Sequence, residues 1–367
     1  MRILMLTETS RLGGAEVMIR NLSHDLRERG HEVGLVAPSN GGDWLHHQME
    51  RDGFPVWQFE LRGAINPDIT GTIRRAIAEF KPDIIHSHLW VMAAYGGYVS
   101  WLARIPHVIT MHGDATETQF FRRRVALRFA FARAKVVVVV SDTMQQDLSR
   151  VLGIPKGQMV VVDNGSSLPQ GDRDRTRLEL GIDAGEFGVL CVGSQGPRKN
   201  HSTVLKAMAL LPQGTDWALM VAGPFGESTQ LLADEATRLG VKSRFRNLGP
   251  RHDVADLLAA SDLFVMPSLW EGMPVALVEA MGAGKAIIVS RVGGMPVMVR
   301  DGVDGVIVDD PLDEKQLSDA IGGLMVDPER RVKMGESARA KARAEYSVAA
   351  MTDTYLELYQ GRQRAYA

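Results

Sequence analysis

Short apolar runs alternate with helix-compatible stretches along almost the whole chain, and this alternation limits the fold more than any other feature. Such alternation is typical of parallel sheets with helices on both faces. The sequence therefore predicts an α/β fold, in which ligands bind beyond the carboxyl ends of the strands. The expected strands are residues 2–6, 33–37, 56–59, 83–86, 107–110, 136–140 and 159–162, then 188–193, 217–222, 245–248, 262–266, 286–290 and 305–308.

The length of 367 residues is too great for one ordinary core and favours two domains. Turn-forming residues without periodicity, among them Asn164 and Gly165, fill residues 163–171, and the strand–helix pattern starts again after them. We therefore expect one α/β domain at 1–165 and a second at 166–347.

The composition is that of an ordinary globular protein, with 45% hydrophobic and 23% charged residues. A net charge of -2 gives no overall field that would draw nucleic acid, so any basic site must be local. The one cysteine, Cys191, excludes an internal disulfide and fits a reducing compartment. The N-terminus lacks the cleavage region of a signal peptide, and no apolar run approaches the ~18 residues of a membrane span. These features predict a cytoplasmic protein that binds no nucleic acid.

The most informative single stretch is residues 261–284, which reads SDLFVMPSLWEGMPVALVEAMGAG. A strand of the buried type ends at Pro267, a loop follows, and Pro274 suits the first position of a helix that ends in glycines. The start of such a helix directs free N–H groups and a positive dipole end at a ligand, and a diphosphate would suit that place. The carboxylates of Glu271 and Glu279 can accept hydrogen bonds from adjacent hydroxyls of a ribose or hexose.

This stretch resembles the signature of the retaining, nucleotide-sugar-dependent glycosyltransferases of family 4. The residues that carry the resemblance are Glu271, Gly272, Met273, Pro274 and Glu279. The resemblance covers essentially the whole chain. It implies two Rossmann-like domains that face a central crevice, the arrangement called GT-B, with the C-terminal helix at 348–367 packed on the first domain. It also implies that the donor binds the second domain and the acceptor mainly the first, without a metal or cofactor. Glu271 would align the sugar and Glu279 would hold the ribose.

The first loop of the chain matches the same family. Gly13 and Gly14 let a backbone approach a ligand closely just before a helix, and the resemblance assigns this loop to the donor phosphates and the acceptor. For Glu16, a site role and a simple role as a partner of the helix dipole stay equally open.

Histidines end two neighbouring strands, with His86 and His88 on one and His112 on the next. Histidine with a nearby acid suggests a metal site, but no third ligand appears at a recognisable spacing, so we expect no metal. The resemblance places His112 close to the transferred sugar. For His86 and His88, a ligand-binding role and a structural role stay open.

The loop that opens the second half departs from the family in one position. Family members carry an arginine directly after the glycine that ends this strand and a lysine about five residues later. Lys199 matches the lysine, whereas Ser194 stands in place of the arginine. Arg198 adjoins Lys199 and could take the place of the arginine, although its side chain should leave the backbone in another direction, so Ser194 and Arg198 are both assigned to the donor site. A cation here would stabilise the departing diphosphate. Gly223 and Pro224 end the next strand and resemble the turn beside the nucleotide base.

Residues 120–135 form a basic, aromatic, helix-compatible stretch, FFRRRVALRFAFARAK. A surface helix with one core stripe and a patch that binds anionic lipid are two interpretations that stay open. A lipid-binding patch on the acceptor side would suit a lipid-linked acceptor. The cations assigned to it are Arg122, Arg123, Arg124 and Arg128.

The sequence thus predicts a retaining, metal-independent hexosyltransferase that uses a nucleoside-diphosphate sugar, with His112, Lys199 and Glu271 as catalytic residues. The expected acceptor is a glycan or lipid-linked molecule of cell-surface polysaccharide or lipopolysaccharide synthesis. An epimerase or phosphorylase on the same scaffold stays open, as does a non-catalytic sugar-nucleotide-binding subunit, which Ser194 favours. A dinucleotide oxidoreductase is disfavoured, because no Gly-x-Gly-x-x-Gly run follows the first strand.

Overall fold

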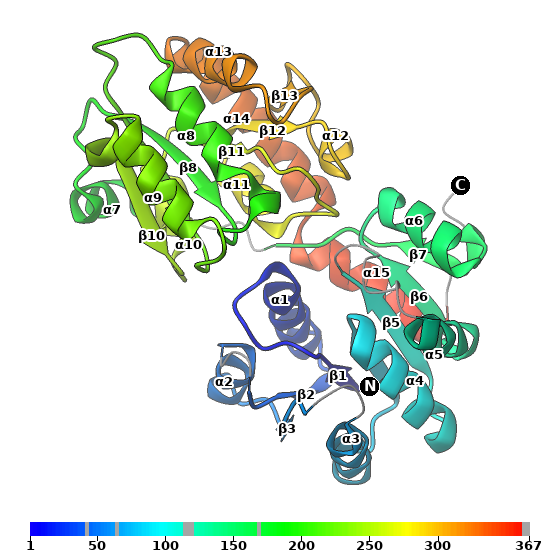
Figure 1. Cartoon of the computed structure of the whole chain (residues 1–367). Helices are drawn as coiled ribbons and strands as arrows, with labels where there is room; N and C mark the ends of the chain where they lie inside the picture. The colour runs from blue at the N-terminus through cyan, green and yellow to red at the C-terminus, as the bar shows by residue number, and fades with distance from the viewer. Residues whose placement is uncertain (41–43, 63–65, 113–120, 167–169, 362–367) are drawn as a thin grey trace. The chain divides into compact units, whose positions relative to one another are not determined.

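The structure, a computed structural model, describes residues 1–40, 44–62, 66–112, 121–166 and 170–361, with the backbone alone described at 121 and 122. The chain divides into two compact units. The first unit combines Met1–Gly165 with Val348–Ala367, and the second contains Ser166–Ser347. In the turn-rich segment, residues 167–169 lie outside the described part of the chain. Figure 1 labels most of the helices and strands of both units.

The first unit is built on a 7-stranded parallel sheet in the order β3-β2-β1-β4-β5-β6-β7. The chain runs from β1 outward to β3 and then crosses back to β4 on the other side of β1. This reversal is the topological switch point of a Rossmann-like sheet. The strands are β1 (Arg2–Leu6), β2 (Glu32–Pro38), β3 (Val56–Phe59), β4 (Ile84–His88), β5 (His107–Met111), β6 (Val136–Val139) and β7 (Met159–Val161).

Both faces of this sheet are buried, as a parallel sheet requires. Along β1, Ile3 and Met5 belong to one apolar cluster and Leu4 and Leu6 to another, because successive side chains of a strand point to opposite faces. Side chains of helix α15 (Val348–Gln360), which is labelled in Figure 1, belong to the first of these clusters. The helices of this unit are α1 (Gly14–Glu28), α2 (Trp44–Arg51), α3 (Pro67–Phe80), α4 (Trp90–Ala103), α5 (Phe121–Arg133), α6 (Asp142–Leu152) and α15 (Val348–Gln360).

The second unit repeats the plan with a 6-stranded parallel sheet in the order β10-β9-β8-β11-β12-β13. Its switch point lies between β8 and β11, which pair with Val189 opposite Leu263. The strands are β8 (Phe187–Val192), β9 (Trp217–Ala222), β10 (Phe245–Gly249), β11 (Leu263–Met266), β12 (Ala286–Ser290) and β13 (Val306–Val308). The helices are α7 (Arg173–Leu180), α8 (His201–Ala209), α9 (Thr229–Arg238), α10 (Val254–Ala260), α11 (Val275–Gly282), α12 (Met295–Met298), α13 (Glu314–Met325) and α14 (Pro328–Glu345).

The two Rossmann-like α/β units predicted from the sequence are confirmed, and the ends of every expected strand agree within two residues. One local prediction was wrong by one position. Pro274 is the N-cap of α11, with extended backbone at φ -76° and ψ 119°, and the helix begins at Val275. The Pro274 carbonyl still accepts a hydrogen bond from the Leu277 N–H, as the carbonyl of an N-cap residue does. None of the helices that the structure describes is long and apolar enough to cross a bilayer.

Candidate functional site

The candidate site of the second unit lies at its switch point, where the loops after β8 and β11 meet. Lys199 ends a short 3-10 turn, Pro197–Lys199, in the first loop, and Glu271 lies in the second. The Lys199 ammonium Nζ lies 2.5 Å from Glu271 Oε1. The two side chains are only 14% and 7% exposed. A cation and a carboxylate are therefore held together, largely out of water, at the carboxyl edge of the sheet.

Glycines allow the neighbouring backbones to approach this pair. A Cβ atom on Gly193 would lie 3.1 Å from the Lys199 side chain, and a Cβ atom on Gly223 would lie 2.1 Å from the Gly193 carbonyl oxygen. The φ of Gly223 is +145°, which favours glycine as well. The Gln195 N–H donates to the Pro224 carbonyl oxygen at 2.9 Å. The sequence-predicted residues Gly223 and Pro224 therefore support the loop that carries Lys199.

The loop after β12 holds the Glu271 loop in place. Gly294 N–H donates to the carbonyl oxygens of Glu271 and Gly272, at 3.3 and 3.2 Å. Gly293 has φ +56°, and a Cβ atom there would lie 1.6 Å from the Glu271 carbonyl oxygen. The Leu269 N–H donates to the Arg198 carbonyl oxygen at 2.8 Å. Three loops thus fix one another around the pair. Gly293 and Gly294 were not among the predicted site residues, although paired glycines after a strand are a signal that the sequence contains.

Residues 272–274 lead into α11, so Gly272, Met273 and Pro274 lie beside the start of that helix. The first N–H groups of a helix lack partners within it, and they carry the positive end of its dipole. Met273 is buried, with 7% of its surface exposed. An anionic ligand at this edge would meet the helix end and the Lys199 ammonium together.

Glu279 projects from α11, and its side chain accepts a hydrogen bond from Ser166 at the start of the second unit. Burial raises the pKa of the Glu279 carboxyl to about 7. Ser166 in turn donates its N–H to the Tyr346 carbonyl oxygen at 3.0 Å and pairs with Ser347. The carboxyl group expected to hold a ribose therefore contacts the point where the chain enters and leaves the second unit. Sequence reasoning did not find Ser166, which belongs to no motif.

Ser194 and Arg198, the two residues at the departure from the family pattern, lie in different surroundings. Ser194 is exposed after β8, and the Arg198 guanidinium lies over the Trp270 ring, 5.6 Å from its centroid. Arg198 is thus directed at the tip of the Glu271 loop. Among the described side chains, Lys199 is the cation paired with Glu271.

In the first unit, the glycine loop is shaped by a buried acid. Gly13 is the N-cap of α1, and a Cβ atom there would lie 2.7 Å from Glu16 Oε2. The Thr9 hydroxyl donates to Glu16 Oε1. Burial raises the pKa of the Glu16 carboxyl. Glu16 therefore stabilises the loop that contains Gly13 and Gly14. A residue that only interacts with the helix dipole would not make these contacts with the loop.

The histidines of the first unit form a buried polar cluster. His88 Nδ1 lies 3.2 Å from His112 Nε2, and the two rings stack. His86 hydrogen-bonds the hydroxyls of Tyr359 and Thr110, at 2.7 and 2.8 Å. Burial lowers the pKa of His112 to about 4. His112 is therefore a neutral hydrogen-bonding group near pH 7, and His86 has a structural role in fixing α15.

Within the described residues, no group of three or more His, Cys, Asp or Glu side chains is arranged to hold a metal ion. The basic stretch forms α5, on which Arg123, Arg124 and Arg128 are exposed. The side chain of Arg122 and the whole of Phe120 lie outside the described residues.

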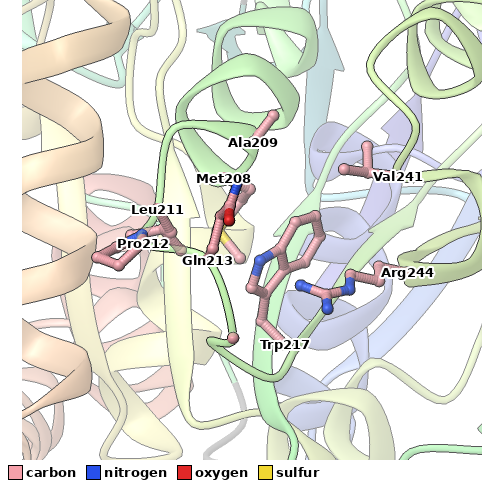
Figure 2. Close-up of a pocket in the computed structure, with 9 residues that line it drawn as sticks. Met208, Ala209, Leu211, Pro212, Gln213, Trp217, Val241 and Arg244 are labelled. Carbon is pink, nitrogen blue, oxygen red and sulfur yellow. The ribbon is translucent and has the colours of Figure 1, made fainter.

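A cavity of about 210 Å³ lies in the second unit, away from the candidate site. Figure 2 shows its wall, where the Arg244 guanidinium lies beside the Trp217 indole, 5.2 Å from the ring centroid. Trp217 begins β9 and Arg244 directly precedes β10, so this cavity is at the amino ends of the strands. The Lys199–Glu271 pair is at the carboxyl ends, and the cavity is not part of that site.

Two protein-family models match the chain. The model described as Glycosyltransferase Family 4 matches residues 12–168, and the model described as Glycosyl transferases group 1 matches residues 172–341.

Named relatives and solved structures agree with these models. The D-inositol 3-phosphate glycosyltransferase of Corynebacterium glutamicum (strain R) is 31% identical over 301 residues, which cover 76% of this chain and 72% of the relative. The alpha-maltose-1-phosphate synthase of Mycolicibacterium smegmatis is 27% identical over 311 residues, 76% of this chain and 78% of the relative. The crystal structure of Anabaena Alr3699/HepE in complex with UDP-glucose has a TM-score of 0.86 and 25% identity, and covers 98% of this chain and 99% of that one.

Proposed function

We propose a specific transfer reaction for this chain, which belongs to the glycosyltransferases of family 4 and group 1. The protein moves a sugar from a nucleoside-diphosphate sugar to a hydroxyl of an acceptor. The observation that carries the proposal is the Lys199–Glu271 pair, 2.5 Å apart at the switch point of the second sheet. A bound donor would replace this ion pair with two contacts. Its diphosphate would bind the Lys199 ammonium, and its sugar hydroxyls would donate hydrogen bonds to the Glu271 carboxylate.

Each residue then has a chemical task. Lys199 and the start of α11 stabilise the charge that develops on the leaving diphosphate, which fixed charges and dipoles do best in a site closed to water. Glu271 orients the sugar, and Glu279 accepts hydrogen bonds from the ribose. In the first unit, His112 and the loop of Gly13 and Gly14 contact the transferred sugar and the acceptor. With a serine at 194, the diphosphate is held by one side-chain cation and the helix dipole.

Retention of the anomeric configuration and independence of metal are part of the proposal. They are supported by the resemblance of the Glu271 stretch to the retaining family. Glu271 is already paired with Lys199, which suits an orienting role better than that of a nucleophile.

The proposed donor is a UDP-hexose, and UDP-glucose is the first candidate because HepE is solved with that molecule. For the acceptor we retain a glycan or lipid-linked molecule of cell-surface polysaccharide or lipopolysaccharide synthesis. A small anionic acceptor is the second candidate, because relatives at 31% identity are named for D-inositol 3-phosphate.

A lipid-linked acceptor would place the enzyme on the inner face of a membrane as a peripheral protein. The exposed cations of α5, Arg123, Arg124 and Arg128, support this location. Each cation near an anionic surface is worth about 1 kcal/mol.

Release of nucleoside diphosphate, measured for a panel of donors with and without candidate acceptors, tests the proposal. We expect UDP release that depends on both UDP-glucose and an acceptor. UDP release without any acceptor would indicate an epimerase or hydrolase. UDP release that requires inorganic phosphate would indicate a phosphorylase. Tight UDP binding by calorimetry with no release for any donor would indicate a non-catalytic binding subunit.

A further inference from the structure

We propose that the outer surface of helices α4 and α5 binds the surface of an anionic lipid bilayer, with aromatic side chains of α4 in its headgroup region. This inference deepens the lipid-linked acceptor of the proposed function and rests on it. We call this surface the α4/α5 face. Its exposed residues are Tyr98, Trp101, Leu102, Arg124, Val125 and Arg128.

Helix α4 has no charged residue along its whole length, Trp90–Ala103. Its last turns are nevertheless open to solvent, because Tyr98, Trp101 and Leu102 are 47%, 49% and 51% exposed. Trp101 and Leu102 lie three and four residues after Tyr98, so the three side chains share one side of the helix. A solvated helix face ordinarily carries charged residues, whereas a clustered apolar face marks a surface with a partner.

Helix α5 lies directly against α4 and extends this surface. A Cβ atom on Gly97 would be 2.7 Å from the Ala130 Cβ, so the glycine lets the two helices pack closely. The Trp101 ring meets the Phe129 ring edge-on, with centroids 5.8 Å apart. The Arg133 guanidinium covers both rings, 5.1 and 4.5 Å from their centroids. Trp101 is therefore held in place while half of it stays exposed.

The charge of this region identifies the partner. Residues 90–112 and 121–141 contain seven Lys and Arg and no Asp or Glu, in a chain whose net charge is -2. The acids Asp114 and Glu117 fall in the segment between them, outside the described residues. On α5 the exposed Arg124 and Arg128 are one turn apart and flank Val125, which is 52% exposed. Apolar side chains with cations beside them match an anionic bilayer, which offers negative headgroups above an apolar layer.

Sedimentation with vesicles of equal parts phosphatidylglycerol and phosphatidylcholine tests the inference. We expect the wild-type chain to bind at low salt, more weakly above about 0.1 M salt, where exposed charges are screened, and hardly at all to phosphatidylcholine alone. Arg124→Glu with Arg128→Glu should weaken binding at least 25-fold, since each lost cation is worth roughly five-fold. Trp101→Ala with Leu102→Ala should weaken it while leaving the salt dependence in place.

Matched variants in the second unit serve as controls. Arg330→Glu with Lys333→Glu makes the same charge change on exposed positions of α14, and Leu178→Ala removes a side chain that is 84% exposed on α7. Both should bind vesicles as the wild type does. Because the Arg124 guanidinium also donates to the Val151 carbonyl oxygen at 2.6 Å, melting temperatures confirm that the variants are folded, and Trp101→Ala with Leu102→Ala leaves that bond intact.

The inference is overturned if the wild type ignores anionic vesicles at low salt, or if the α14 control is released as strongly as the α5 variant. It is also overturned if Trp101→Ala converts a wild-type dimer to monomers, since the occupant would then be a second copy. Vesicle binding requires no donor and no turnover. A wild-type chain that releases UDP in an acceptor-dependent way but does not bind anionic vesicles would therefore reject this inference alone, and vesicle binding without any transfer would reject the proposed function alone.

Discussion

At the scale of single residues, Lys199 and Glu271 balance each other's charge. Their side chains are 14% and 7% exposed, so removal of either leaves the other charge nearly buried and unpaired. An unpaired buried charge costs considerably more than a surface charge. Effects of the two single substitutions will therefore not be additive, and a double-mutant cycle is the appropriate measurement.

Lys199→Ala should lower kcat about 100-fold or more, because the leaving diphosphate loses its cation. Glu271→Ala should abolish turnover with little change in nucleotide affinity, because the proposed partner of this carboxylate is the sugar and not the nucleotide. The double variant should lose less free energy of unfolding than the sum of the two single variants, since it leaves no unpaired buried charge. Kinetics and UDP calorimetry on the single variants and denaturant unfolding of all three measure this, and additive losses of stability would show that the two charges do not balance each other.

Glu279 offers a test by pH, because burial raises the pKa of its carboxyl to about 7. A ribose hydroxyl donates to the ionised form, so nucleotide affinity should rise as pH increases through about 7 and fall below it. Glu279→Ala should weaken binding by about 1.5–3 kcal/mol, the value of a hydrogen bond to a charged group. In Glu279→Gln the part of the pH dependence due to this carboxyl should vanish. Equal pH profiles for wild type and Glu279→Gln in calorimetry would reject the ribose role.

At the scale of elements, three loops at the carboxyl edge of the second sheet fix one another. Those loops follow β8, β11 and β12, and the first two strands are neighbours only because the chain order reverses between them. The Glu271 loop depends on Gly293, whose φ of +56° and lack of a side chain allow the closest backbone approach.

Gly293→Ala should therefore reduce turnover strongly, because its Cβ atom would lie 1.6 Å from the Glu271 carbonyl oxygen and displace that loop. The matched control is Gly240→Ala. Gly240 also has a positive φ, +72°, but open space where its Cβ atom would be. Both variants carry a backbone cost of about 1–2 kcal/mol for alanine in this region. If both variants keep the same turnover, the loop contact does not position Glu271.

Most elements were predictable because many strands are continuous apolar runs between turn residues, as in Val136–Val139. Helix α7 was not expected, because its sequence RDRTRLEL has no apolar stripe. The acid Asp172, which caps its start, was the local signal for a helix there. For the site, the motif indicated Glu271 and the loop position indicated Lys199. Their pairing required the register of β8 against β11. Contacts such as Glu279 with Ser166 join residues more than a hundred positions apart and leave no local pattern.

At the scale of the whole molecule, the two units differ in their buried histidines. The first unit buries His86, His88, His107 and His112, and burial lowers the pKa of each, to about 3 for His107 and about 4 for His112. In the described part of the second unit, His201 is the histidine so affected, with a pKa of about 4. In the first unit, His86 also ties β4 and β5 to α15 through Tyr359 and Thr110.

This difference predicts that acid destabilises the first unit before the second. The folded histidines stay neutral while the unfolded chain takes up protons below about pH 6.5, so their stabilisation is complete above that pH and is lost as pH falls towards 4. Each such histidine contributes about 1.4 kcal/mol per pH unit in that window. Hydrogen exchange at pH 7 and pH 5 measures it. His107→Gln should reduce the loss of stability of the first unit between pH 7 and pH 5, whereas His47→Gln, at an exposed position, should leave that loss unchanged. Equal acid sensitivity of the two units would reject this prediction.

The central claim is that this chain transfers a sugar from a UDP-sugar through the Lys199–Glu271 pair. The most direct measurement is NMR of the product formed from UDP-[¹³C]glucose and a panel of acceptors, for wild type and Glu271→Ala side by side. We expect a labelled glycoside with the anomeric configuration of the donor from the wild type, and none from a Glu271→Ala variant that still binds UDP. A product of inverted configuration, or equal product from the variant, would contradict it.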